Sequence, residues 1–292
     1  MNFSAVTVSF PIDMETFEEI LKLCEEAALA DAVRYELIMN IQAVKNYEMS
    51  GFCVLVYDDE YNKLVGLASA VDMMGLKTYE WSIVVAPTYR QLGIGQSLLQ
   101  EVYKGLSMRE AEGELALTLE QAPFGARFLA NNGYQYSFSE VTMQGEAKAS
   151  EQQENIVIRR YEQADQQILI ETFMAAFGDT VEEAQDLIAY NTAAENLILW
   201  VAVMEGSVVG TVTTREENTV QWLTALAVHP QYAGRGIGST LLKWVQQLAF
   251  DEGQQHVLLD VEIDNARALS IYEKGGFIKS TQIDYYVYVN KA

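Results

Sequence analysis

One stretch of this sequence decides the fold: His229-Pro230-Gln231-Tyr232-Ala233-Gly234-Arg235-Gly236-Ile237-Gly238. A matching stretch occurs 143 residues earlier, as Ala86-Pro87-Thr88-Tyr89-Arg90-Gln91-Leu92-Gly93-Ile94-Gly95. At the same offset Leu98-Leu99 matches Leu241-Leu242, and Gly133-Tyr134 matches Gly276-Phe277. Self-similarity at one fixed offset indicates repeated structural units. The sequence therefore predicts two homologous domains.

The junction between the two copies is expected near Gly145–Asn155, a polar segment rich in small residues, as linkers are. We therefore predict an N-terminal domain over 1–145, a linker over 146–155 and a C-terminal domain over 156–292. In each copy, short apolar strands and a Gly-bounded hairpin alternate with amphipathic helices. The pattern predicts α/β (α+β) domains, each with a mixed, mostly antiparallel sheet flanked by helices.

The C-terminal copy shows this pattern more clearly. We predict strands at 156–159, 199–204, 207–213, 220–228, 256–263, 277–280 and 284–289, and helices at 168–177, 238–252 and 265–274. In the N-terminal copy the same order predicts a helix within 10–29, strands at 52–57, 64–70 and 81–85, a helix at 94–108 and a strand at 115–119.

Composition narrows the class of protein. Half of the 292 residues are hydrophobic, which suffices for packed cores, and no apolar run approaches the roughly 18–20 residues of a membrane span. The start of the sequence lacks a signal-peptide pattern, and Cys24 and Cys53 have no close Cys or His partner. These features predict a cytoplasmic protein without a metal site, a disulfide framework or a membrane partner.

The formal charge of −22 is shared about equally by the two halves. No basic patch for nucleic acid is present. An acidic surface attracts cationic substrates such as amines, although it is also common on proteins that are simply well solvated.

The glycine loop indicates an anion site. Glycines between a strand and a helix allow close backbone approach, and the free N–H groups at a helix start attract phosphate. A P-loop is excluded because Ser239 follows Gly238 directly, where a lysine is required. A dinucleotide fingerprint is excluded because the third glycine is missing. A coenzyme A pyrophosphate and a plain strand-to-helix turn remain.

A second motif accompanies the loop, Asn265-x-x-Ala268-x-x-x-Tyr272-x-x-x-Gly276-Phe277. Together the two motifs resemble the GNAT superfamily of acyl-CoA N-acyltransferases, of the tandem-repeat type. The resemblance covers nearly all of 156–292 and extends more weakly over 1–145. It implies an N-acetyltransferase that moves an acetyl group from acetyl-CoA to a primary amine by direct transfer. The alternative is a non-catalytic acyl-CoA-binding or regulatory module.

The resemblance also implies roles for single residues. Tyr272 is the implied general acid, which protonates the departing thiolate. The implied cofactor-binding residues are Ala227 and Val228, whose backbone pairs with the pantetheine arm, the loop residues Gly234, Arg235, Gly236, Ile237, Gly238 and Ser239, and Asn265. One backbone N–H of the strand serves as an oxyanion hole.

The sequence departs from the family at two positions of the C-terminal copy. Ala233 stands where many members carry Arg or Gln, and Trp222 stands where many carry the Glu that acts as base. The candidates for the missing base are Glu262, Asp264, His229 and a water molecule, and no base is needed if the amine has a low pKa. The base stays unassigned.

The N-terminal copy departs elsewhere. Its loop keeps Arg90, Gln91, Gly93 and Gly95, which form a possible second cofactor site. Its second motif is lost, because Ala122 and Leu129 stand at the positions of Asn265 and Tyr272. Glu80 lies one residue out of step with Trp222, so we expect it on the opposite face of its strand. This copy is predicted to be catalytically degenerate. The sequence identifies neither the acceptor amine nor the oligomeric state.

Overall fold

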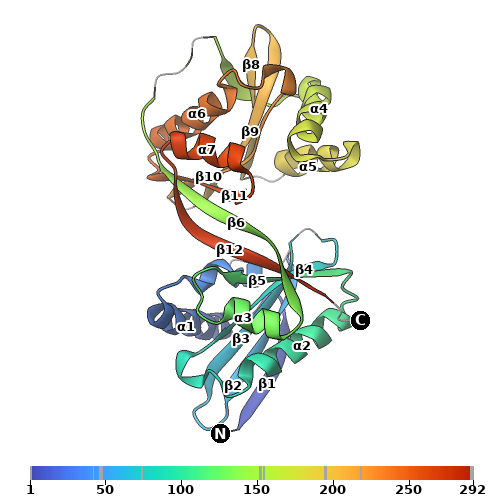
Figure 1. The fold of residues 1–292 in the computed structure, drawn as a ribbon, viewed down its shortest axis with the longest axis vertical. Helices are drawn as coiled ribbons and strands as arrows, with labels where there is room; N and C mark the ends of the chain where they lie inside the picture. The colour runs from blue at the N-terminus through green and yellow to red at the C-terminus, as the bar shows by residue number, and fades with distance from the viewer. Residues whose placement is uncertain are drawn as a thin grey trace. The chain divides into compact units, whose positions relative to one another are not determined.

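The computed structural model describes residues 2–41, 43–45, 49–73, 75–150, 153, 155–193, 196–217 and 219–289 (Figure 1). The chain forms two compact units. Unit 1 comprises residues 1–139 and 282–292, and unit 2 comprises residues 140–281.

Unit 1 is a sheet with helices on both faces. Its elements are β1 (Phe3–Ser9), α1 (Met14–Asp31), β2 (Ser50–Asp58), β3 (Lys63–Asp72), β4 (Thr78–Val85), α2 (Ile94–Met108), β5 (Gly113–Leu119), α3 (Gly125–Asn131), the first part of β6 (Tyr134–Glu146) and the last part of β12 (Ile278–Tyr288). The strand order runs β1-β2-β3-β4-β5-β12. Only the β4–β5 pair among those described is parallel.

Unit 2 repeats this plan. It contains the second part of β6, β7 (Val157–Arg160), α4 (Gln166–Phe177), α5 (Val181–Ala193), β8 (Leu197–Met204), β9 (Ser207–Glu217), β10 (Val220–Val228), α6 (Ile237–Asp251), β11 (His256–Glu262), α7 (Ala266–Lys274) and the start of β12. The order is β6-β11-β10-β9-β8-β7, with β10 and β11 parallel. The predicted fold class is confirmed.

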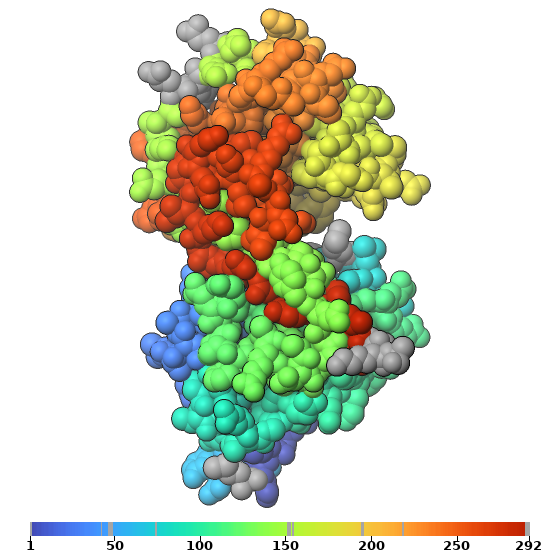
Figure 2. Space-filling view, in the orientation of Figure 1, coloured from blue at the N-terminus to red at the C-terminus, as the bar shows by residue number. Residues whose placement is uncertain are grey.

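Alternating side chains place the helices on opposite faces of each sheet. On β2, the Tyr57 hydroxyl donates to Glu19 of α1 at 2.7 Å, whereas Phe52 lies against Gly105 of α2. In unit 2, α6 and α7 lie on one side of the β8–β9 hairpin and α4 and α5 on the other (Figure 1). The α4–α5 pair, in yellow-green, forms part of the outer surface of unit 2 (Figure 2).

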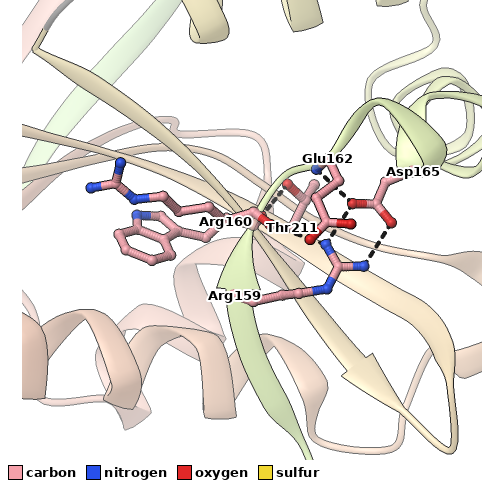
Figure 3. Close-up of polar contacts among 6 residues, drawn as sticks. Arg159, Arg160, Glu162, Asp165 and Thr211 are labelled. Carbon is pink, nitrogen blue, oxygen red and sulfur yellow. Dashed lines mark hydrogen bonds and ion pairs between the residues drawn. The ribbon is translucent and has the colours of Figure 1, made fainter.

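An ion pair fixes the start of α4. The guanidinium of Arg159 on β7 donates to both carboxylate oxygens of Asp165, at 2.7 and 2.8 Å (Figure 3). The Glu162 backbone N–H donates to the same carboxylate at 2.9 Å. The next residue, Arg160, places its guanidinium 5.7 Å from the ring centroid of Trp200. These contacts join the edge strand to the first helix of unit 2.

The last strand of each repeat is divided between the two units. Residues 140–146 of β6 pair with β11 in unit 2, and Ile283–Tyr286 of β12 pair with β5 in unit 1. The division at 1–145, 146–155 and 156–292 predicted from the repeat therefore differs from the division by contacts. The physical reason is that repeat matching detects homology, whereas strand pairing depends on partners far away in sequence. Residues 151, 152 and 154 of the predicted linker lie outside the described residues.

Several elements differ from the sequence expectation. The strands predicted at 277–280 and 284–289 form one continuous strand, β12. Four helices and strands of the described residues were not predicted, namely β1, α3, β6 and α5. Helix α3 follows Pro123 and begins at Gly125, where a Cβ would clash with the Thr118 hydroxyl oxygen. Glycine at this position therefore lets α3 pack closely on β5.

Candidate cofactor and acceptor site

In each unit the two parallel strands pair only over their first residues. The opening between them beyond the last paired residues is called the fork. The β4–β5 ladder covers Thr78–Trp81 with Gly113–Ala116, and the β10–β11 ladder covers Val220–Trp222 with His256–Leu258. The later residues of β4 and β10 continue without this partner among the described residues. An open strand edge of this kind can pair with an extended ligand.

The antiparallel register shows which backbone groups face each fork. Ala86 N–H donates to Val65, and His229 N–H donates to Val209, so these are hydrogen-bonded pairs. Because such pairs alternate along the ladder, the preceding residues, Val85 and Val228, turn their N–H and C=O toward the fork. By the same alternation the backbone of Ala227 faces β9, so of the two predicted pantetheine contacts the register favours Val228.

A β-bulge distinguishes the two forks. The β9–β10 register shifts between Thr224 and Ala227, where Ala225 has a φ of 48°, whereas the β3–β4 register is continuous. The bulge adds one residue to β10. As a result Glu80, which pairs with Leu115, and Trp222, which pairs with Leu258, occupy equivalent positions. The expectation that Glu80 faces the opposite side of its strand is wrong, because it ignored this insertion.

The two glycine loops share one backbone conformation. Gln91 and Gly93 have φ values of 63° and 85°, and the equivalent Gly234 and Gly236 have values of 77° and 81°. The first helical hydrogen bonds after these loops run from Ser97 N–H to Gly93 and from Thr240 N–H to Gly236. The N–H groups of 94–96 and 237–239 therefore precede the first helical bond and can bind an anion.

The loops also leave room for a ligand. A Cβ built on Gly93, Gly234 or Gly236 would meet no atom within 4 Å. Space beside exposed N–H groups at a helix start fits a pyrophosphate. Arg235 and Ser239 are exposed in this loop, whereas Ile237 and Gly238 are buried against the core. Gly95 lies closer to its neighbours, with Phe128 at 3.2 Å from the position of a Cβ.

Arg90 makes internal contacts in the unit 1 loop. Its Nη1 and Nη2 donate to Asp31 at 2.8 and 2.5 Å, and its Nε donates to the carbonyl of Val85 at 3.2 Å. The Arg90 guanidinium beside Asp31 lowers the pKa of that carboxyl. The Val85 carbonyl faces the fork, so Arg90 already uses an acceptor that a ligand arm would need. Ala233 makes no such bond in unit 2.

A cavity of about 470 Å³ opens at the unit 1 fork. Its walls come from the segment after α1, from the end of β4, from the loop and from α3, and include Tyr35, Val85, Arg90, Gly93, Thr118 and Phe128. The sequence indicated the loop and the strand but gave no signal for Asp31 or Tyr35. The Tyr35 hydroxyl donates to Asp31 at 2.8 Å and adds a third hydrogen bond to this carboxylate.

The second motif of unit 2 lies on α7. The Asn265 side-chain oxygen accepts from Ala268 N–H at 3.1 Å and caps the helix, which leaves its amide donors as the groups that could contact a ligand. Tyr272 is 8% exposed, and its ring centroid lies 6.2 Å from that of Phe277. Burial raises the pKa of Tyr272 to about 12, so its hydroxyl is protonated at neutral pH.

The other candidate residues have simpler environments. His229 is buried, and its Nδ1 accepts from Gln231 N–H at 3.4 Å, whereas Glu262 and Asp264 are exposed. In unit 1, Leu129 is buried in the core and Ala122 lines the cavity. Among the described residues, no group of three or more His, Cys, Asp or Glu side chains could hold a metal ion. No helix in the described part of the chain is long and apolar enough to cross a bilayer.

Comparison with known proteins identifies the class. The model of the Acetyltransferase (GNAT) family matches residues 14–122 and 166–277, one region in each repeat. Human N-acetyltransferase 8B is 35% identical over 96 residues, which are 30% of this chain and 42% of that protein. The MAK3 N-alpha-acetyltransferase of Arabidopsis thaliana is 30% identical over 97 residues, which are 32% of this chain and 50% of that protein. The matches thus span half or less of these relatives.

Solved structures share the whole fold. A GCN5-related N-acetyltransferase from Sphaerobacter thermophilus has a TM-score of 0.73 at 19% identity, over 96% of this chain and 94% of its own. A tandem GNAT protein from the clavulanic acid biosynthesis pathway has a TM-score of 0.70 at 16% identity, over 98% of both chains. The chain belongs to the GNAT acetyltransferase family and contains two copies of its domain. The family predicted from the two motifs is confirmed.

Proposed function

We propose that this protein is an acetyl-CoA-dependent N-acetyltransferase that acts on a primary amine, with unit 2 as the transferring copy. The observation that carries the proposal is the combination, in one unit, of an open fork, an anion-binding loop at the end of the same strand, and a tyrosine on the neighbouring helix. Family membership supports acyl-CoA-dependent acetyltransferase chemistry.

The residues present fit coenzyme A. The N–H groups around Gly234–Ser239 would hold the pyrophosphate, and the fork-facing backbone of Val228 would pair with the pantetheine arm. Amide donors of Asn265 would contact the arm. A backbone N–H of β10 near the bulge would polarise the thioester carbonyl, as in an oxyanion hole.

Direct transfer is supported by the state of the cysteines. Burial raises the pKa of both Cys24 and Cys53 to about 12, so neither is a thiolate at neutral pH. Both are also buried in the core of unit 1, away from solvent. The amine is therefore proposed to attack the thioester itself, while Tyr272 donates its proton to the departing sulfur.

Unit 1 is proposed to be a second acyl-CoA-binding copy without efficient transfer. Its cavity, loop conformation and Gly93 resemble those features of a cofactor site, whereas Leu129 cannot donate a proton. The alternative function, a non-catalytic acyl-CoA-binding module, is favoured for this unit alone.

The test combines binding with turnover. Calorimetric titration of the whole chain with acetyl-CoA should give at least one site, and CoA release should accompany addition of a suitable primary amine. The amine panel should include a polyamine, an aminoglycoside, free amino acids and a peptide N-terminus. Binding without CoA release for every amine would favour the non-catalytic alternative, and no binding would contradict both.

A further inference from the structure

The carboxylate missing from β10 is replaced on the adjacent strand. Trp222 pairs with Leu258, and Asp260 is two residues further along β11, so all three side chains project from one face of the unit 2 sheet. The opposite face carries Val257, Leu259 and Val261, which pack in the core with α6. Asp260 itself is exposed.

Asp260 lies beside the apex of the fork. The β10–β11 ladder ends at Trp222 and Leu258, and Asp260 is the next residue of β11 on that face. An arm that extends along β10 from the glycine loop must end where the two strands meet. Its reactive end would therefore come close to Asp260.

The exchanged strand β6 orients this carboxylate. Thr142 pairs directly with Asp260, and its hydroxyl donates to Asp260 Oδ1 at 2.6 Å. Threonine holds the carboxylate without adding charge, and it leaves the second oxygen for another donor. Thr142 comes from the first half of the chain, yet it lies on the same face of the unit 2 sheet as Asp260.

In unit 1 the carboxylate and the apolar residue have exchanged strands. Glu80 is equivalent to Trp222, and the residue equivalent to Asp260 is Leu117, which is buried. At this pair of equivalent positions, the carboxylate therefore lies on β4 in unit 1 and on β11 in unit 2. On the paired strands β9, β10, β11 and β6, the charged and titratable side chains that share the face with Asp260 are Arg215, Glu217, Glu140, Glu146, His256 and Glu262. Arg215 is already paired with Glu217 at 2.9 Å, and its guanidinium lies 5.8 Å from the Trp222 ring centroid.

We infer that Asp260 is the group that binds the acceptor ammonium and takes its proton, so the substrate class is a primary amine that is cationic at neutral pH. This inference rests on the proposed function. The ammonium gives one proton to the Asp260 carboxylate, and the neutral nitrogen attacks the thioester carbon. The N–C bond forms, the C–S bond breaks, the sulfur receives the Tyr272 proton, and the second proton of the nitrogen returns to Tyr272. The proton on Asp260 leaves to water, which gives amide, free thiol and one released proton.

The experiment compares Asp260→Asn with Glu146→Gln, which removes an exposed carboxylate from the same face of the unit 2 sheet. Asp260→Asn keeps an acceptor for Thr142 and should lower kcat/KM for a cationic amine by about 10²–10⁴, the range for loss of a general base. The acid limb of its pH profile should disappear, while acetyl-CoA affinity stays within two-fold. Glu146→Gln should change kcat/KM less than three-fold. An amine that is already neutral at pH 7 should lose much less with Asp260→Asn than a cationic one.

Two outcomes overturn the inference: equal kcat/KM in Asp260→Asn and wild type, or an equal loss for neutral and cationic amines. A wild-type protein that binds acetyl-CoA but neither acetylates nor binds any amine overturns the proposed function together with this inference. That failure is seen before any substitution is made, so the two are distinguishable.

Discussion

Arg90 holds Asp31 through both terminal nitrogens of its guanidinium, and the pair connects the glycine loop of unit 1 to α1. The side chains are only 19% and 6% exposed, so the ion pair is largely removed from water. Because Arg90 also donates to the fork-facing carbonyl of Val85, the same contact shapes the loop and the strand edge beside it.

Replacing Asp31 with Ala should lower the free energy of unfolding by about 3 kcal/mol, because it leaves a mostly buried cation without its partner. Urea denaturation at pH 7 measures this loss. The matched control is Glu26→Ala, which breaks the ion pair with Lys63, whose side chains are 44% (Lys63) and 34% (Glu26) exposed. This control should cost less than about 1 kcal/mol. Equal losses for the two variants would show that the Arg90–Asp31 pair contributes no more to the free energy of unfolding than an exposed ion pair.

Acid should weaken both units through two carboxylates. Arg90 lowers the pKa of Asp31. Arg159, whose ion pair with Asp165 is drawn in Figure 3, lowers the pKa of Asp165. A carboxyl whose folded pKa is depressed contributes stability above its unfolded pKa of about 3.9 and loses it as pH falls through the folded value. These pairs should therefore contribute constantly from pH 5 to 8, and stability should fall below pH 4. The slope below pH 4, measured by urea denaturation, should be smaller in the Asp31→Asn, Asp165→Asn double variant than in wild type.

The sequence predicted the features that depend on residues close together along the chain, namely single helices and loops. Helix periodicity located α2 and α6, and the glycine pattern located two loops that prove to share one backbone conformation. Strand exchange was not predictable, because the partners of β6 and β12 lie far away in sequence. The one-residue difference between Glu80 and Trp222 was in fact the signal of the β10 bulge, but it was interpreted as a change of face. The Arg90–Asp31 pair spans 59 residues and left no local pattern.

Cutting the chain between the repeats should unfold both parts. A fragment of residues 1–146 lacks Tyr285 and Tyr286, which are buried in unit 1, and a fragment of 147–292 lacks Val141 and Met143, which are buried in unit 2. Each fragment would also expose an unpaired strand edge. Circular dichroism during thermal denaturation should show no cooperative transition for either part alone.

The control for the cut chain is 1–146 with residues 278–289 appended through a flexible linker, which restores the β5–β12 pairing. This fragment should recover a cooperative transition. If plain 1–146 unfolds as cooperatively as the extended form, the exchanged strand is dispensable for unit 1.

Tyr272→Phe should fold and bind acetyl-CoA normally but lose about 10²–10⁴ in turnover, the usual effect of removing a general acid. Because burial raises the pKa of Tyr272 to about 12, its loss should not change the shape of the pH profile between pH 6 and 9. Single-turnover kinetics at saturating acetyl-CoA isolates the chemical step. A wild-type rate in that measurement would assign Tyr272 to the core alone, and more than half the steady-state activity would indicate transfer by unit 1.

Two matched substitutions, Gly236→Val in unit 2 and Gly93→Val in unit 1, should distinguish the two proposed cofactor sites. Both glycines have φ values above 80° and open space where the new side chain would stand. Each valine therefore costs similar backbone strain, and each would occupy the space proposed for the pyrophosphate. Gly236→Val should weaken acetyl-CoA binding by at least about 2 kcal/mol, comparable to a lost charge-assisted hydrogen bond, and should remove activity. Gly93→Val should remove one site from the calorimetric stoichiometry and leave turnover within two-fold. The reverse assignment, with activity lost in Gly93→Val and kept in Gly236→Val, would place transfer in unit 1, where Glu80 stands beside the fork.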